Sequence, residues 1–354
     1  MSARIWSKQR CSTSPSLRRR RPAGRRARIE RLERRNLLSA SGWGFEIGSA
    51  GVSVATAIGV DDEGGIVVAQ SFTGTVDLDP GPGTFNLTSQ GGNLGDGVVA
   101  KYTADHQLLW ASPFGGTFSE EITGLDRDDA GNTYITGYFN SLSAQFGPFT
   151  LSTHLDSQGV ATTDTFVAKL SPDGEFLWAH SYGGGDTDKG WDIEVTDSGD
   201  VFVAGRYYET VDFDPDPNAS FLLSSDPGDR QGVIWKLDTD GNFQWVHEIG
   251  GPGRDEMGRV AVDSSGNIYA TGHFRETVNF GSAESPILLT SSTPNYNDTF
   301  LLKLDASGET QWARHITGTE IVGAARLTLG GDSTIYTAGW FDTNADFPDG
   351  TSLS

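Results

Sequence analysis

Five tryptophans recur along this chain at spacings of 67, 68, 67 and 67 residues. They are Trp43, Trp110, Trp178, Trp245 and Trp312. A lysine stands nine residues before each of the last four, at Lys101, Lys169, Lys236 and Lys303. A single irregular core gives no reason to keep such markers in phase over about 300 residues. The chain is therefore a tandem array of similar units.

Each unit has the pattern of four short antiparallel strands. In the second copy an Asp/Gly turn at residues 128–132 precedes an apolar strand at 133–137. A third strand at 166–170, a second tight turn and a tryptophan-bearing strand at 176–179 follow. Asp/Gly turns tolerate positive φ and join antiparallel strands. The second strand is apolar or small on both faces, which predicts burial between neighbouring sheets. No helical periodicity occurs, so the pattern predicts an all-β chain of β-propeller blades.

The run Asp-Thr-Phe-Val-Ala-Lys-Leu at 164–170, with Gly174, Trp178 and a following Gly-Gly pair, resembles the bacterial β-propeller repeat family labelled SBBP. The resemblance covers residues 43–354 and implies an all-β propeller of four-stranded antiparallel blades. Members of that family are mostly secreted or surface proteins, and no common activity defines them.

The copies predict four full repeats of about 67 residues, from about residue 53 to residue 318, with partial blades at both ends. A fifth copy begins near Ile321, and Trp43 marks a lone fourth strand at the other end. Either a five-blade ring is incomplete, or the chain is a piece of a longer repeat protein. We favour the second, because an open sheet edge is an aggregation hazard. We expect the repeat domain at 43–354 to be incomplete at its C-terminal end.

Charge divides the chain into two unlike parts. Residues 1–36 hold 13 Lys and Arg against Glu30 and Glu33, a charge of +11, and the remainder carries −32. We interpret residues 1–42 as an Arg-rich disordered leader or export segment. A plain disordered tail and a nucleic-acid-binding arm are the alternatives, although the acidic body argues against nucleic acid. The only cysteine, Cys11, leaves the body without disulfide or thiol chemistry. No segment is long and apolar enough to span a bilayer.

Residues 31–40, Arg-Leu-Glu-Arg-Arg-Asn-Leu-Leu-Ser-Ala, resemble the LEPR-x-LL-SA motif that opens many exported proteins of certain bacteria. Arg34 stands where that motif has proline. The resemblance implies an extracellular or cell-surface location in a bacterium.

Two groups of residues are candidates for a site on the loop-rich rim of the propeller. Alternate aspartates in Gly/Pro turns supply the hard oxygen ligands that suit Ca²⁺, and they are Asp77, Asp79, Asp212, Asp214 and Asp216. The competing interpretation is turn carboxylates that accept hydrogen bonds from their own backbone. Glu120, Glu121, Asp186, Asp188, Asp255 and Glu256 in the loops between blades add to the expected acidic rim.

The second group follows a glycine at the end of the second strand, where the side chain changes from copy to copy: Ser71, Tyr138, Arg206, His273 and Trp340. Trp191 is similar, since its counterparts Thr56, Thr123 and Gly258 are small. Exposed Trp and Tyr stack on sugars or anchor protein partners, so Tyr138, Trp191, Arg206, His273 and Trp340 are candidate ligand contacts. Local packing beneath the loops is the alternative.

No nucleophile elbow, metal-protease cluster or phosphate loop occurs, so no catalytic or cofactor-binding residue is assigned. The interpretation that best fits is an exported binding or structural module for a carbohydrate or protein partner, without nucleic acid and with Ca²⁺ as a lead. The alternative is a secreted polysaccharide-active hydrolase or lyase with its site over the central channel. A cluster of non-repeating polar residues converging on that channel would favour the alternative.

Overall fold

The computed structural model describes residues 4–6, 53–61, 63–92, 94–293, 296–318, 322–331, 334–341, 344–348 and 352–353. Within these ranges every regular element is a β-strand, as the repeat pattern predicts. Trp43 and nearly all of the proposed leader, 1–42, lie outside the described residues. The prediction of four-stranded antiparallel blades is confirmed, and the total number of blades stays a prediction.

Four blades are complete, and each is named here by its four main strands. The first has β2 (Ser53–Val60), β3 (Ile66–Phe72), β6 (Asp96–Tyr102) and β7 (Leu108–Gly116). The second has β8 (Glu120–Arg127), β9 (Thr133–Phe139), β12 (Asp164–Leu170) and β13 (Phe176–Tyr182). The third has β14 (Lys189–Val195), β15 (Val201–Tyr208), β18 (Arg230–Leu237) and β19 (Phe243–Ile249). The fourth has β20 (Glu256–Val262), β21 (Ile268–Phe274), β24 (Asp298–Leu304) and β25 (Thr310–Ile316).

A fifth unit begins with β26 (Val322–Leu329) and β27 (Ile335–Phe341). The segment β1 (Arg4–Trp6) pairs with β27 in the parallel direction, at the edge where the other blades carry their third strand in the antiparallel direction. The fifth sheet is thus built differently from the four before it.

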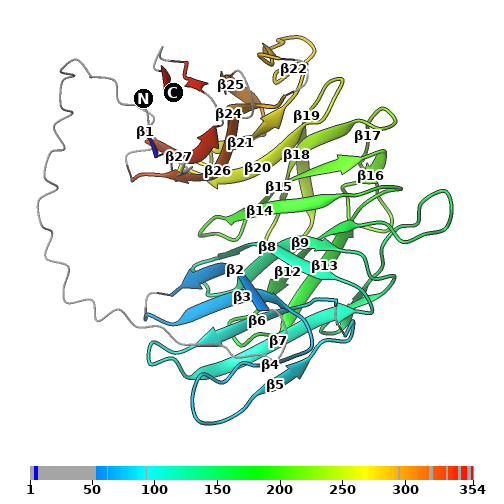
Figure 1. The fold of residues 1–354 in the computed structure, drawn as a ribbon, viewed down its shortest axis with the longest axis vertical. Helices are drawn as coiled ribbons and strands as arrows, with labels where there is room; N and C mark the ends of the chain where they lie inside the picture. Colours follow the sequence, from blue (N-terminus) through cyan, green and yellow to red (C-terminus); the bar gives the residue numbers. More distant parts are fainter. Residues whose placement is uncertain are drawn as a thin grey trace, which may run out of the picture.

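The blades follow one another in chain order, from the blue and cyan strands at the bottom of Figure 1 to the orange and red strands at its top. The first strands of successive blades (β2, β8, β14, β20 and β26) contact one another. The blades therefore converge along these first strands, which form the inner side of the array. The tryptophan-bearing strands β7, β13, β19 and β25 are the fourth in each sheet.

Between the second and third strand each unit inserts a small hairpin. The pairs are β4 (Thr75–Asp77) with β5 (Asn86–Thr88), β10 (Ala144–Phe146) with β11 (Phe149–Leu151), β16 (Thr210–Asp212) with β17 (Leu222–Ser224), β22 (Thr277–Asn279) with β23 (Leu288–Thr290), and β28 (Ala345–Asp346) with β29 (Ser352–Leu353). They lie on the side where one blade leads into the next, which is called the loop-rich rim below.

The hairpins link neighbouring blades. Strand β10 of the second blade pairs with β7 of the first, so the first sheet has six strands. In later units the contact shrinks to a bridge, Gly250 to Asn279 and Thr317 to Asp346. In the second, fourth and fifth units the hairpin therefore meets the end of the last strand of the blade before it.

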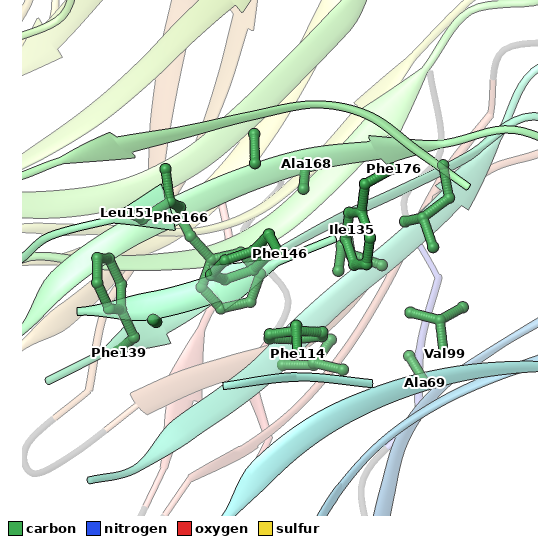
Figure 2. Packing of buried hydrophobic residues seen from close by; sticks show 14 of the residues in the cluster. Ala69, Val99, Phe114, Ile135, Phe139, Phe146, Leu151, Phe166, Ala168 and Phe176 are labelled. Carbon is green, nitrogen blue, oxygen red and sulfur yellow. The ribbon is translucent and has the colours of Figure 1, made fainter. Parts of the chain in front are cut away.

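Aromatic packing fills the space between the first two blades (Figure 2). Phe114 of β7 stacks on Phe146 of the neighbouring hairpin, with ring centroids 4.5 Å apart. The edge of Phe166, from the second blade, meets Phe114 at 5.3 Å. All three side chains are buried. Burial of large apolar side chains between sheets is the main stabilising contribution in such a stack.

The repeating tryptophans also lie between blades. The indole nitrogen of Trp110 donates to the carbonyl of Pro172 in the next blade, at 2.9 Å. Trp178 likewise donates to the carbonyl of Thr239, at 3.2 Å. Trp178 is buried, whereas the three other repeating tryptophans of the described blades, Trp110, Trp245 and Trp312, are half-buried. The series therefore has a structural role between blades.

Candidate functional site

Eight side chains from three adjacent blades gather on the inner side of the loop-rich rim. This group is called the rim cluster, and it consists of Glu121, Tyr138, Lys189, Trp191, Arg206, Arg230, Glu256 and His273. They lie at the start of a blade's first strand, at the end of its second strand or at the start of its third strand. These three strand ends are on the same side of the sheet. Their chemistry differs from blade to blade, although the strands that carry them repeat.

Trp191 occupies a β-bulge in the innermost strand of the third blade. The pairing of β14 with β15 shifts between Gly190 and Asp192, so Trp191 is the extra residue. The other blades have the same bulge, at Thr56, Thr123 and Gly258. A bulge re-aims the side chain that it carries. The large indole therefore stands at a position where the rest of the array keeps a small side chain.

Two aromatic rings and two cations meet at this bulge. The Trp191 indole meets the edge of the Tyr138 ring, with centroids 6.0 Å apart. Lys189 Nζ lies 3.6 Å from the centroid of Tyr138 and 5.5 Å from that of Trp191. Arg206 Cζ lies 5.4 Å from the indole. Such cation–π contacts hold the cations against the rings. The Tyr138 hydroxyl donates to the exposed carboxylate of Glu121.

The cluster has more cationic side chains than carboxylates that pair with them. Glu256 Oε2 lies 2.8 Å from Arg206 and 3.4 Å from Arg230, so one oxygen serves two guanidinium groups. Within the described residues Lys189 forms no ion pair within 4.0 Å. Trp191 Nε1, Arg206 Nε and Arg230 Nε are buried there without an acceptor. The cluster is thus rich in hydrogen-bond donors.

Burial is the main cause of the pKa shifts in the cluster. Burial and the nearby Arg206 lower the pKa of Lys189. Burial also lowers the pKa of His273, with Glu256 opposing that shift. His273 Nδ1 lies 3.5 Å from the hydroxyl of Thr299. At neutral pH His273 is therefore an uncharged imidazole, and the positive charge rests on the lysine and the arginines.

The structure brings together four of the five candidate ligand contacts, Tyr138, Trp191, Arg206 and His273. Trp340 occupies the equivalent position in the fifth unit and is 47% exposed. Within the described part of the chain no ring or cation contact joins Trp340 to the cluster.

Neither Lys189 nor Arg230 is among the candidates that the sequence predicts. Lys189 aligns with Val54, Glu121 and Glu256 in the other blades, at the same spacing of 67 or 68 residues as Trp191 and its counterparts, so a change of chemistry at a repeating position was the available signal. The contact of Lys189 with the two rings is seen only in the structure.

The carboxylates between blades correct the expectation of an acidic surface there. Glu120, Asp188 and Asp255 are buried at 0%, 1% and 0% exposure. Asp188 accepts from the backbone nitrogens of Gly184, at 2.8 Å, and Tyr208, at 2.7 Å.

Asp255 repeats this arrangement with Gly251 and Arg275. Glu120 accepts from Gly116. These groups join the end of one blade to the next, because a buried carboxylate needs hydrogen-bond donors. Glu121 and Asp186 are the residues of this set that are exposed.

The candidate calcium ligands lie in side-chain-to-backbone turns at the start of the hairpin loops. Asp77 Oδ1 accepts from the nitrogens of Asp79 and Phe85, and Asp212 Oδ1 accepts from those of Asp214 and Phe221. Asp79 and Asp214 each accept from the backbone two residues later, and so does Asp216.

In the fourth blade the amide of Asn279 forms the same two bonds, to Gly281 and Ile287. Within the described residues no three His, Cys, Asp or Glu side chains form a group that could hold a metal ion. Calcium binding by Asp77, Asp79, Asp212, Asp214 and Asp216 stays a prediction.

A second set of polar side chains lies deeper along the inner strands. Asp126 accepts from the nitrogen of Val195 in the next blade, at 2.7 Å, and Asp192 accepts from Val260, at 3.1 Å. Asp192 also lies 3.5 Å from Arg259. Burial raises the pKa of Asp126 to about 6 and that of Glu194 to about 8. These carboxylates hold the free edges of adjacent first strands together.

Comparison with known proteins finds similarity to repeat proteins. The SBBP family profile, described as a beta-propeller repeat, matches residues 244–273. An uncharacterized WD repeat-containing protein of Acanthamoeba polyphaga mimivirus is 24% identical over 211 residues. That match covers 52% of this chain and 15% of the viral protein. A solved protein of unknown function from Bacteroides caccae aligns with 68% of this chain and 94% of its own, at 12% identity and a TM-score of 0.20.

Among the described residues no helix is long and apolar enough to cross a membrane.

Proposed function

We propose that this chain, a β-propeller repeat protein, is a binding module that holds a carbohydrate against the rim cluster. The observation that supports the proposal most is the pair Tyr138 and Trp191. They stand at positions that vary between blades, on strands whose neighbouring residues repeat. Aromatic faces beside polar groups are the usual platform for sugar rings, which are apolar on one face and hydroxylated at the edge.

Its place in the fold also supports the proposal. The cluster draws on three blades, so no single repeat could form it. Binding sites are commonly found on loops and element ends that a rigid scaffold positions. Here the scaffold is the stack of sheets, with its buried carboxylates and aromatic layers between blades.

The test is a glycan microarray probed with the full chain and with Trp191→Thr. Thr56 and Thr123 occupy the same bulge in the first two blades, so the fold accepts threonine there. We expect binding to one class of glycans and its loss in Trp191→Thr. Leu109→Thr, at a 55% exposed side chain of β7, is the control that should bind as the wild type does. Equal binding by Trp191→Thr would remove the proposal, and selective capture of protein ligands instead would favour a protein partner.

An export role is part of the same proposal. The basic segment 1–36 and the resemblance of residues 31–40 to the LEPR-x-LL-SA motif support secretion to a bacterial surface or to the medium. N-terminal sequencing of the native protein from cell fractions tests this point. Recovery of residues 1–40 on the protein inside the cell would contradict it and would revive the nucleic-acid arm.

The second candidate is a polysaccharide-active enzyme. Non-repeating polar side chains on the inner strands favour it, and so do the raised pKa values of Asp126 and Glu194, since a carboxylic acid protonated near neutral pH can serve as a general acid. Incubation of the chain with the glycans that it binds, followed by chromatography of the products, separates the two functions. Shortened products that Asp126→Asn abolishes would favour the enzyme.

A further inference from the structure

We infer that the carbohydrate carries an anionic group, a carboxylate or a sulfate, which Lys189, Arg206 and Arg230 recognise. This inference rests on the proposed function, because it concerns the same site. It identifies the class of ligand as acidic polysaccharides. The aromatic pair Tyr138 and Trp191 would contact the sugar ring, and the cations would contact its anionic group.

Charge at the cluster contrasts with charge in the rest of the body. Residues 37–354 carry a formal charge of −32, yet three cations meet at this one place. Electrostatic repulsion by the body lowers the affinity of an anion everywhere except where cations are gathered. A site that selects an acidic sugar on so acidic a protein therefore needs a local group of this kind.

The ion pairs within the cluster do not neutralise all of its cationic side chains. Glu256 accepts from both arginines through one oxygen, and Glu121 is engaged by the Tyr138 hydroxyl. Lys189 is held by the rings of Tyr138 and Trp191, without an anionic partner within 4.0 Å in the described residues. Charge-assisted hydrogen bonds from lysine and arginine are the strong bonds to carboxylate and sulfate oxygens.

Buried donors in the cluster point the same way. Trp191 Nε1, Arg206 Nε and Arg230 Nε have no acceptor among the described residues. A buried donor without an acceptor raises the free energy of the folded protein. When small shifts of the side chains expose these donors, a ligand rich in acceptors would lower that free energy. A neutral sugar offers hydroxyl groups, whereas an acidic sugar adds oxygens that only accept.

The experiment compares matched pairs of oligosaccharides by calorimetry with the full chain. Oligogalacturonate is measured beside its methyl ester, and a sulfated galactan fragment beside its desulfated form. We expect at least one acidic member to bind about tenfold or more tightly than its neutral partner, with a difference that shrinks as salt rises. The pair that shows the difference distinguishes carboxylate from sulfate.

Two variants test whether the cations are the cause. Lys189→Glu places the residue of the second and fourth blades at this position, so the fold has a precedent for it. It should lower affinity for the acidic member at least about tenfold more than it lowers affinity for the neutral member. Arg230→Gln should act in the same direction, and its thermal unfolding shows whether the lost Glu256 contact disturbs the fold.

The outcomes separate the two proposals. Equal affinity for acidic and neutral members overturns the anionic ligand and leaves carbohydrate binding standing. Absence of binding to every glycan on the array, acidic ones included, removes both. If Lys189→Glu loses affinity for the acidic and the neutral member equally, Lys189 has a structural role, which would contradict the inference.

Discussion

The indole of Trp110, in the last strand of the first blade, lies against Gly174 in the turn before the last strand of the second. A Cβ at Gly174 would come within 2.6 Å of the indole ring. Gly241 and Gly308 stand in the same relation to Trp178 and Trp245. The glycine and the tryptophan of the repeat are therefore two halves of one contact between neighbouring blades.

Replacing that glycine should destabilise the stack more than its backbone angle alone explains. Gly174 has φ 86°, and Gly159 has φ 78° with nothing within 4 Å of an added Cβ. We expect Gly159→Ala to cost about 1 kcal/mol for the left-handed backbone and Gly174→Ala about 2–4 kcal/mol, because steric overlap adds to it. Urea unfolding of both variants measures the difference. Equal losses would mean that the contact with Trp110 contributes nothing.

The turn aspartates yield a prediction that separates calcium from turn chemistry. Asn279 forms the same backbone bonds as Asp212, so Asp212→Asn should change the unfolding free energy by less than about 0.5 kcal/mol, and Asp212→Ala should cost about 1–2 kcal/mol. Melting is followed in EDTA and in millimolar Ca²⁺. A calcium-dependent rise in Tm that Asp212→Asn abolishes would instead identify a metal site.

The buried carboxylates predict how stability changes with pH. Burial raises the pKa of Glu120 to about 7, above that of an exposed glutamate, and that of Asp255 to about 7. A raised pKa means that the folded state holds its proton more strongly than the unfolded state does. The stabilisation is full below about pH 4.5 and is lost as pH rises to about 7, by up to roughly 3 kcal/mol for Glu120.

Glu120→Gln should flatten the fall in unfolding free energy between pH 5 and 7, since the amide oxygen can still accept from Gly116. Denaturant unfolding of the wild type and the variant at three pH values measures this. An unchanged slope in the variant would show that Glu120 titrates alike in both states.

Sequence reasoning predicts the repeating parts of the fold and fails where blades differ. Turn glycines and the short apolar segments between them predict the strands, because those patterns act locally. The burial of Asp188 depends on how the end of β15 meets the segment that follows β13, a contact between blades that no local pattern encodes.

The functional site is likewise predicted only in part by the sequence. Tyr138 and Trp191 stand out in the sequence because they break the repeat. Their meeting with Lys189 depends on the bulge in β14, which becomes visible only in the pairing of β14 with β15. Glu256, taken as an acidic surface group, is the shared partner of two arginines.

The most direct test of the proposed function is a calorimetric titration of the best array ligand into the wild type and into Trp191→Thr. Loss of one stacked ring should weaken binding at least about tenfold, which is about 1.4 kcal/mol, while the melting curve stays unchanged. The same Kd for both proteins, with the ligand bound at one site, would contradict carbohydrate binding at the rim cluster.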